Sequence, residues 1–249
     1  MLSKSQIGFI KSLHQKKYRK ENGMFIIEGI KSIIEFIPST YQLHSIYYLA
    51  ENKAALSNLP SNIKLFEVNN AELAKISTLQ APQGILALVH IPKTDIFKPE
   101  ALKNNFTLVL DGVQDPGNMG TIIRTADWFG IKNIICSQNT VEIYNPKTIQ
   151  ATMGSLCRVN VYYLDLPIWL SQVEIPIFGA LLEGSSSYDI SWGKEGVLIL
   201  GNEGQGISGE VIKFIQHPVT IPRVGSAESL NVAISAGILC AEISRNLNK

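Results

Sequence analysis

Short apolar segments alternate with amphipathic ones from Thr107 to the C-terminus, and this alternation limits the possible folds more than any other feature. Apolar runs of this length predict strands, and apolar residues at helical spacing predict helices. Strands joined by helices run parallel, and a parallel sheet is covered on both faces. The second part of the chain is therefore predicted to be an α/β domain. Its predicted strands are residues 106–110, 133–136, 158–164, 176–182, 197–200 and 219–221, and its predicted helices are residues 118–129, 146–153, 207–215 and 229–246.

The first hundred residues predict a second, smaller α/β unit. Its predicted helices are residues 5–13, 30–36 and 71–76, and its predicted strands are residues 45–50, 64–68 and 85–91. The stretch that follows is polar, contains two prolines and shows no clear period, which is typical of a linker. We therefore expect a domain at residues 1–92, a linker at 93–105 and a larger domain at 106–249.

Basic side chains are concentrated at the N-terminus. The whole chain has a formal net charge of +1, but residues 1–31 hold seven basic and two acidic side chains. A basic segment of this kind indicates a polyanionic partner or, alternatively, a solvated helix face. The basic residues are Lys4, Lys11, Lys16, Lys17, Arg19, Lys20 and Lys31.

The chain has three cysteines, at widely spaced positions in apolar stretches that are expected to be buried: Cys136, Cys157 and Cys240. The odd number and the absence of a C-x-x-C pair argue against a disulfide framework and a zinc site, so we expect no metal and a cytoplasmic location. No apolar run approaches the ~20 residues that a membrane helix needs, so we expect no membrane partner.

Residues 111–127 form the first of three polar, glycine-containing segments, each of which follows a predicted strand. Ligands of parallel α/β folds bind beyond the carboxyl ends of the strands. Asn118 is a plausible N-cap of the next helix. Arg124 lies among apolar residues of that helix, so we expect it to be partly buried and to have an acidic partner. The candidate partners are Asp111, Asp115 and Asp127.

Residues 198–208 form the second segment. Its glycines do not have the spacing of a dinucleotide-binding loop, and it has no G-K-[ST] of a P-loop. Glu203 lies between these glycines and would repel a phosphate, so the segment favours a neutral or cationic ligand or is a plain turn. In the third segment, residues 220–242, Ser229 and Asn231 head a helix of small and apolar residues, which is typical of a capped core helix or of close packing between subunits.

Together the three segments resemble the SpoU (TrmH-like) family of RNA ribose 2′-O-methyltransferases, within the SPOUT superfamily. The family's first motif, N-x-G-x-x-x-R, is similar to Asn118, Gly120 and Arg124. The second, G-N-E-G-x-G, matches residues 201–206, and the third, I-P-x-x-G-x-x-E-S-L-N-V, matches residues 221–232. Residues 11–29 and 80–89 resemble the RNA substrate-binding domain of many members. Arg223 departs from the family pattern, because members often carry an apolar residue there.

The resemblance implies a C-terminal SPOUT domain with a parallel sheet and a deep trefoil knot, an exception to the rule that chains are unknotted. It also implies S-adenosylmethionine as the methyl donor and a homodimer formed through the C-terminal domain. The residues that it implies for the methyl donor are Leu200, Gly201, Asn202, Gly204, Ile221, Gly225, Ser229, Leu230 and Asn231.

The resemblance also implies which residues act on the RNA. Arg124 would deprotonate the ribose 2′-hydroxyl or clamp a neighbouring phosphate, and Glu203 would pair with Arg124. Asn118 would orient the ribose or Arg124, while Ser229 and Asn231 would shape the loop and hydrogen-bond the substrate. Phosphate contacts would come from Lys11, Lys16, Lys17, Arg19 and Lys20.

The sequence therefore predicts a methyltransferase that uses S-adenosylmethionine to methylate a ribose 2′-hydroxyl, with ribosomal RNA as substrate. A transfer RNA substrate and a non-catalytic assembly factor that binds ribosomal RNA remain alternatives. The five predicted catalytic residues argue against the assembly factor. The absence of a dinucleotide fingerprint argues against an oxidoreductase.

Overall fold

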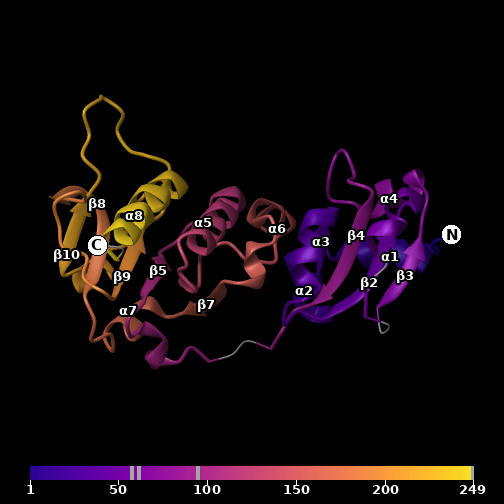
Figure 1. Cartoon of the computed structure of the whole chain (residues 1–249), viewed down its shortest axis with the longest axis horizontal. Helices are drawn as coiled ribbons and strands as arrows, with labels where there is room; N and C mark the ends of the chain where they lie inside the picture. The colour runs from indigo at the N-terminus through magenta and orange to yellow at the C-terminus, as the bar shows by residue number, and fades with distance from the viewer. Residues whose placement is uncertain (57–58, 61–62, 94–95, 248–249) are drawn as a thin grey trace. The chain divides into compact units, whose positions relative to one another are not determined.

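A computed structural model describes residues 1–56, 59–60, 63–93 and 96–247 of the chain. It has two compact units (Figure 1). The first unit comprises residues 1–94 together with residues 142–157, and the second comprises residues 95–141 together with residues 158–249.

The first unit contains a four-stranded mixed sheet in the order β1-β4-β2-β3. β4 pairs antiparallel with β1 and β2, whereas β2 and β3 run parallel. The strands are β1 (Met24–Glu28), β2 (Leu43–Tyr48), β3 (Lys64–Glu67) and β4 (Ile85–His90). The helices are α1 (Lys4–Ser12), α2 (Lys16–Asn22), α3 (Ile30–Phe36), α4 (Asn70–Ile76) and α6 (Pro146–Thr152), with 3-10 turns η1 (Ala50–Leu56) and η3 (Ser155–Cys157). The smaller α/β unit is confirmed, although its α2 and β1 were not predicted.

Local sequence signals explain where two of these helices begin. The Ser3 hydroxyl accepts from the Gln6 backbone N–H at the start of α1, and the Gln6 side chain accepts from the Ser3 N–H. Asn69 and Glu72 form the same reciprocal pair at the start of α4. Such capping boxes satisfy donors that a helix N-terminus leaves free.

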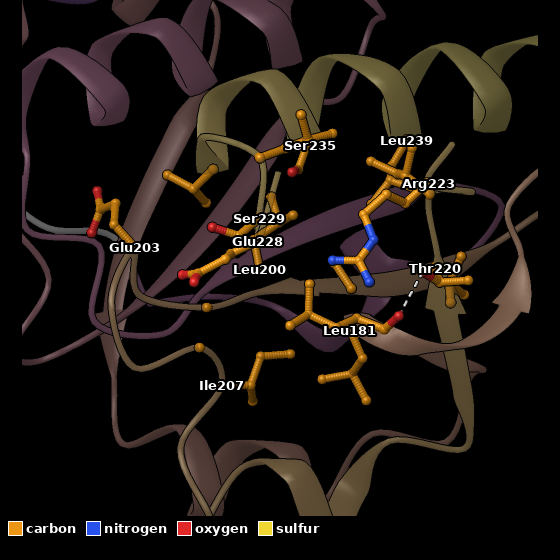
Figure 2. Close-up of a pocket in the computed structure, with 18 of the residues that line it drawn as sticks. Leu181, Leu200, Glu203, Ile207, Thr220, Arg223, Glu228, Ser229, Ser235 and Leu239 are labelled. Carbon is orange, nitrogen blue, oxygen red and sulfur yellow. Dashed lines mark hydrogen bonds between the residues drawn. The ribbon is translucent and has the colours of Figure 1, made fainter. Parts of the chain in front are cut away.

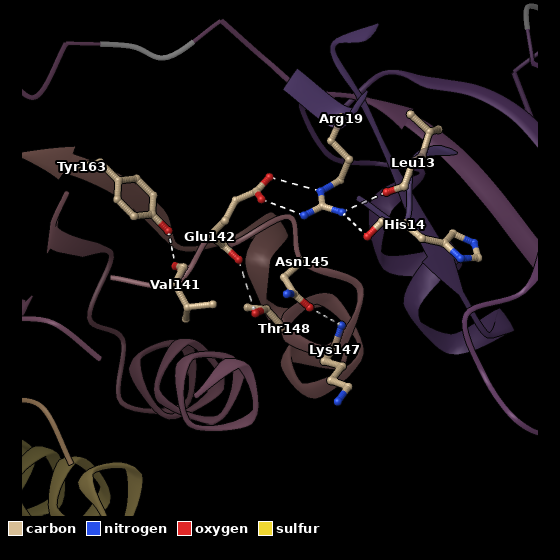
Figure 3. A network of polar contacts seen from close by, with 9 residues as sticks. All are labelled: Leu13, His14, Arg19, Val141, Glu142, Asn145, Lys147, Thr148 and Tyr163. Atoms are coloured by element: carbon tan, nitrogen blue, oxygen red, sulfur yellow. Dashed lines mark hydrogen bonds and ion pairs between the residues drawn. The ribbon is translucent and has the colours of Figure 1, made fainter. Parts of the chain in front are cut away.

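Arg19 joins α2 to the segment Glu142–Cys157 (Figure 3). Its side chain is only 2% exposed, and its Nη2 and Nε donate to the two carboxylate oxygens of Glu142 at 2.7 and 3.2 Å. Its Nη1 donates to the carbonyl oxygens of Leu13 and His14. Two expectations are corrected here. Arg19 is buried in an ion pair and does not face a phosphate. The segment that holds Glu142 was predicted to belong to the domain at 106–249, but it packs as part of the first unit.

We predict that Arg19→Ala lowers the free energy of unfolding by about 2–4 kcal/mol, because it leaves the mostly buried Glu142 carboxylate without its cation. The matched control is Lys20→Ala, one residue along the same helix and exposed, for which we expect a change of no more than ~0.5 kcal/mol. Urea denaturation of both variants measures the difference. Equal midpoints for the two variants would contradict a stabilising role of this pair.

The second unit is built on a six-stranded parallel sheet in the order β10-β8-β9-β5-β6-β7. Its strands are β5 (Phe106–Leu110), β6 (Asn133–Ser137), β7 (Asn160–Leu164), β8 (Ile177–Ser186), β9 (Gly196–Leu200) and β10 (His217–Thr220). Its helices are α5 (Pro116–Trp128), α7 (Leu166–Leu170) and α8 (Val232–Leu247), with 3-10 turns η2 (Pro99–Leu102) and η4 (Ile212–Phe214). α5 and α8 pack against each other (Figure 1). The predicted α/β fold with a parallel sheet is confirmed.

Two local expectations for this unit are wrong. The predicted linker at 93–105 contains η2, and Phe97 and Leu102 are buried in the core of the second unit, so part of the stretch belongs to that unit. The predicted helix at 207–215 is reduced to the 3-10 turn η4. The glycine-rich turn that precedes it continues to Gly209, and glycine is a poor helix former.

Candidate functional site

The three polar segments follow the carboxyl ends of β5, β9 and β10 of the second unit, of which β5 and β9 are neighbours in the sheet. β5 lies between β9 and β6 in the sheet. The strands β6 and β7 lie on one side of β5 and the later strands β8, β9 and β10 lie on the other, which makes a topological switch point of the kind where α/β folds bind ligands. The Asp111 carboxylate after β5 accepts from the Ser208 backbone N–H at 2.7 Å. The Asn202 amide after β9 donates to the Gly112 carbonyl at 2.7 Å. These hydrogen bonds hold the first two segments together.

Asn202 also organises the glycine-rich turn of the second segment. Its Oδ1 accepts from the backbone N–H groups of Gly204 and Gln205 at 2.8 and 3.0 Å. Its own backbone exchanges two hydrogen bonds with Gly206, which has a positive φ of 71°. A Cβ at Gly201 would lie 2.2 Å from the Gly206 carbonyl carbon, so only glycine permits this close approach of two backbone segments.

A cavity of about 810 Å³ opens beside this turn (Figure 2). Its walls come from β8, the end of β9, the end of β10, the loop at residues 221–230 and the first turns of α8. The labelled side chains include the apolar Leu181, Leu200 and Leu239 and the acidic Glu203 and Glu228. The cavity is therefore mainly apolar with a few polar groups, as small-molecule sites usually are.

One wall of the cavity was not predicted from the sequence. β8 pairs with β10 at Gly179 and again at Ser185, and the register shift between them leaves residues 180–184 as a bulge. Ala180, Leu181 and Leu182 of this bulge line the cavity. Gly179, just before the bulge, and Gly184, its last residue, were the available sequence signal, because glycine within a strand often marks a bulge.

Nearly all of the residues that the resemblance implies for the methyl donor line this one cavity. Asn231 is the exception, although its neighbours on both sides line the cavity. The residues that do so are Leu200, Gly201, Asn202, Gly204, Ile221, Gly225, Ser229 and Leu230.

A chain of side-chain hydrogen bonds joins the three motifs next to the cavity. Asn231 donates from Nδ2 to the Oδ1 of Asn118 at 3.0 Å, and Asn118 donates from Nδ2 to the Oε1 of Glu203 at 2.9 Å. Asn231 uses its Oδ1 to accept from the N–H of Ala233 and Ile234, at the start of α8. The chain therefore ties a helix N-terminus to a carboxylate of the cavity wall.

The expected roles of two residues in this chain need correction. Asn118 is not the N-cap of α5, because the Asp115 carboxylate accepts from the Asn118 backbone N–H at 2.8 Å and caps the helix. Glu203 does not pair with Arg124. Its oxygens accept from the Asn118 side chain and from the Gln114 backbone N–H. Because Asp115 caps the helix, the Asn118 amide is available to hydrogen-bond to Glu203 and Asn231.

Arg124 is exposed, contrary to the expectation of partial burial. Within the described part of the chain its guanidinium makes no hydrogen bond or ion pair. Each of the three expected partners is bound elsewhere: Asp111 to Ser208, Asp115 to Asn118 and Asp127 to Arg158. Arg124 lies six residues along α5 from Asn118, and because it has no partner among the described residues it can bind an external anion.

Arg223 extends into the cavity from the loop at residues 221–230 (Figure 2). It donates from Nη1 to the Ala227 carbonyl at 3.1 Å, which bridges the loop. The departure from the family pattern thus places a cation in the cavity wall.

The other predicted side chains lie outside this site. Lys11, Lys16, Lys17 and Lys20 are exposed on α1 and α2. Cys136 and Cys240 are buried, and burial raises the pKa of the Cys240 thiol to about 12, which makes it unreactive. Cys157, expected to be buried, is only partly so. Among the described residues no cluster suits a metal ion, and no helix there is long and apolar enough to cross a membrane.

Comparisons with known proteins identify the family that the three motifs resemble. The model of the SpoU rRNA Methylase family matches residues 105–241, and that of the MRM3-like substrate binding domain matches residues 4–87. The 23S rRNA (guanosine(2553)-2′-O)-methyltransferase RlmP of Bacillus subtilis is 30% identical over 92% of each chain. A solved TrmH-family protein of Porphyromonas gingivalis, described as a putative RNA methyltransferase, is 39% identical with a TM-score of 0.87 over 98% of this chain and 99% of its own. An AdoMet-bound rRNA methyltransferase of Sinorhizobium meliloti is 29% identical with a TM-score of 0.87 over 99% and 97%.

Proposed function

Because this chain belongs to the SpoU rRNA methylase family, we propose that it transfers a methyl group from S-adenosylmethionine to a ribose 2′-hydroxyl of ribosomal RNA. The observation that carries the proposal is the hydrogen-bonded chain Asn231–Asn118–Glu203, which unites one residue of each motif beside the cavity. A ribosomal substrate would place the protein with the ribosome, and we propose a cytoplasmic location on that ground.

The cavity suits the methyl donor chemically. Apolar side chains such as Leu181 and Leu200 can contact an adenine ring, and the glycine-rich turn offers backbone groups at close range. The carboxylates of Glu203 and Glu228 suit a ligand that carries a sulfonium and an ammonium. S-adenosylmethionine supplies a methyl group that is already activated by its sulfonium.

The protein's contribution is then to position and polarise the ribose hydroxyl. The 2′-oxygen attacks the methyl carbon in line, the carbon–sulfur bond breaks, and the hydroxyl loses its proton. An arginine stays protonated at physiological pH, so it has no lone pair available to accept a proton. We therefore assign to Arg124 the clamping of a neighbouring phosphate and the stabilisation of the developing alkoxide, with the proton passing to water. The role of base is the alternative for the same residue.

Two further properties belong to the proposal. We propose a homodimer formed through the second unit, supported by the exposed apolar side chains Trp128 on α5 and Ile234 on α8. Sedimentation of the purified protein as a monomer at micromolar concentration would contradict the dimer. We also propose that the loop at residues 221–231 takes part in the trefoil knot that is typical of the family.

Methyl transfer from labelled S-adenosylmethionine to unmodified ribosomal and transfer RNA tests the function. We expect label in ribosomal RNA and one linkage that resists alkali, because a methylated 2′-oxygen cannot attack the neighbouring phosphate. Label in transfer RNA alone would change the substrate class. Binding of the donor without label in either RNA would support the non-catalytic alternative.

We predict that the charge reversal Lys16→Glu, Lys17→Glu, Lys20→Glu weakens RNA binding by tenfold or more at ~100 mM salt and leaves donor affinity unchanged. These lysines are exposed on α2, and phosphate contacts dominate RNA affinity at such salt concentrations. The matched control reverses three exposed lysines elsewhere in the first unit: Lys53, Lys64 and Lys75. Filter binding at several salt concentrations measures the effect. Equal losses in the two triple variants would show a general charge effect and no specific surface.

A further inference from the structure

Arg124 and Asp127 lie three residues apart on α5, a spacing at which an arginine and a carboxylate on a helix surface normally attract each other. Asp127 instead holds a different arginine. Arg158, at the start of the segment that leads into β7, donates from Nε to both carboxylate oxygens at 3.0 Å and from Nη2 to Oδ2 at 2.8 Å. The Arg158 guanidinium thus binds both carboxylate oxygens of Asp127. Arg124 forms no ion pair with any of the described residues.

We propose that Arg158 is a positioning residue for methyl transfer: it occupies Asp127 and so keeps the Arg124 guanidinium free for the RNA. The inference rests on the proposed function, in which Arg124 acts on the substrate. A bidentate contact between a guanidinium and a carboxylate is stronger and more directional than a single contact along a helix. Arg158 therefore wins the competition for Asp127.

Removing Arg158 would harm Arg124 in two ways. Asp127 would lose its bidentate partner and could pair with Arg124, and its negative charge would oppose the approach of a phosphate to Arg124. Asp127 also lies in the last turn of α5, where a negative charge is unfavourable because of the helix dipole. If Arg158 had a purely structural role, its removal would lower the stability of the protein but would not change the ion pairing of Arg124.

The test compares Arg158→Ala with the double variant Arg158→Ala, Asp127→Asn in the full-length protein. The first readout is kcat/KM for RNA at low salt. The second is the rate at which phenylglyoxal modifies Arg124, followed by mass spectrometry, because pairing with a carboxylate protects a guanidinium. Donor affinity and melting temperature are recorded for each variant. The matched control is Arg245→Ala, which removes a comparable ion pair with Glu242 on α8.

We expect Arg158→Ala to lower kcat/KM about two- to fivefold and to slow the labelling of Arg124 to a similar extent, with donor affinity unchanged. Asp127→Asn in the same chain should restore both quantities, because the asparagine cannot form the competing ion pair. Arg245→Ala should change neither.

Unchanged labelling and rate in Arg158→Ala would overturn the inference, and so would failure of Asp127→Asn to restore them at an equal melting temperature. These outcomes differ from failure of the proposed function. If the wild type transfers no methyl group, or if Arg124→Ala transfers it at the wild-type rate, the proposed function fails, and the inference fails with it.

Discussion

Arg124→Ala is expected to reduce methyl transfer at least about 100-fold while donor affinity and melting temperature stay at wild-type values. The side chain is exposed and makes no ion pair or hydrogen bond with the described residues, so its removal costs the fold little. Removal of one preorganised group that stabilises developing negative charge typically costs 10²–10³-fold in rate, roughly 3–4 kcal/mol. Single-turnover transfer to ribosomal RNA at saturating donor isolates this effect from binding. Lys132→Ala, an exposed cation just after α5, is the control.

Arg124→Lys distinguishes the two roles of the residue. Lysine keeps the charge but loses the planar fork, so a phosphate clamp should retain a small part of the activity with little dependence on pH near neutrality. A lysine loses its proton at a lower pH than an arginine, so a general base at this position should give activity that rises steeply with pH. A rate for Arg124→Ala within threefold of the wild type would exclude both roles.

The central strands β5, β6 and β9 could be predicted because a buried parallel strand is largely apolar, and this signal is local. The failures concern contacts between distant residues. Arg19 and Glu142 are 123 residues apart, and no local pattern indicates that the segment around Glu142 belongs to the first unit. The predicted helix at 207–215 failed for a local reason, since Gly209 lies near its start and glycine is a poor helix former.

The members of the site could be predicted from the motifs, whereas their partners could not. Segments that follow parallel strands leave the same edge of the sheet. Here the second and third segments line one cavity, and Asn118 of the first segment donates to Glu203 of the cavity wall. Which side chain pairs with which depends on rotations that the sequence does not specify. Glu203 was expected to hold Arg124 and instead accepts from Asn118. Asn118 was expected to cap α5, yet Asp115 caps it and leaves the Asn118 amide for the site.

Gly201→Ala is expected to weaken binding of S-adenosylmethionine at least about 100-fold, or ~2.7 kcal/mol. The new Cβ would lie 2.2 Å from the Gly206 carbonyl carbon and 2.4 Å from the Ile207 nitrogen, which are backbone atoms that no side-chain rotation can move. The turn must therefore open, and opening breaks the paired hydrogen bonds between Asn202 and Gly206 at 2.9 and 3.0 Å. All of these residues line the cavity, so its wall changes shape.

Gly204→Ala is the matched control, in the same turn and the same cavity wall. Its Cβ would meet only the Asn202 Oδ1, at an ordinary 3.7 Å, and its φ is not in the left-handed region, so we expect donor affinity within threefold of the wild type. Calorimetric titration of both variants with S-adenosylmethionine and with its demethylated product gives the comparison, and the melting temperature shows whether each variant is folded. A folded Gly201→Ala variant that binds the donor as tightly as Gly204→Ala would show that the donor does not depend on this turn. The assignment of the cavity to the donor would then be wrong, because this turn forms part of the cavity wall.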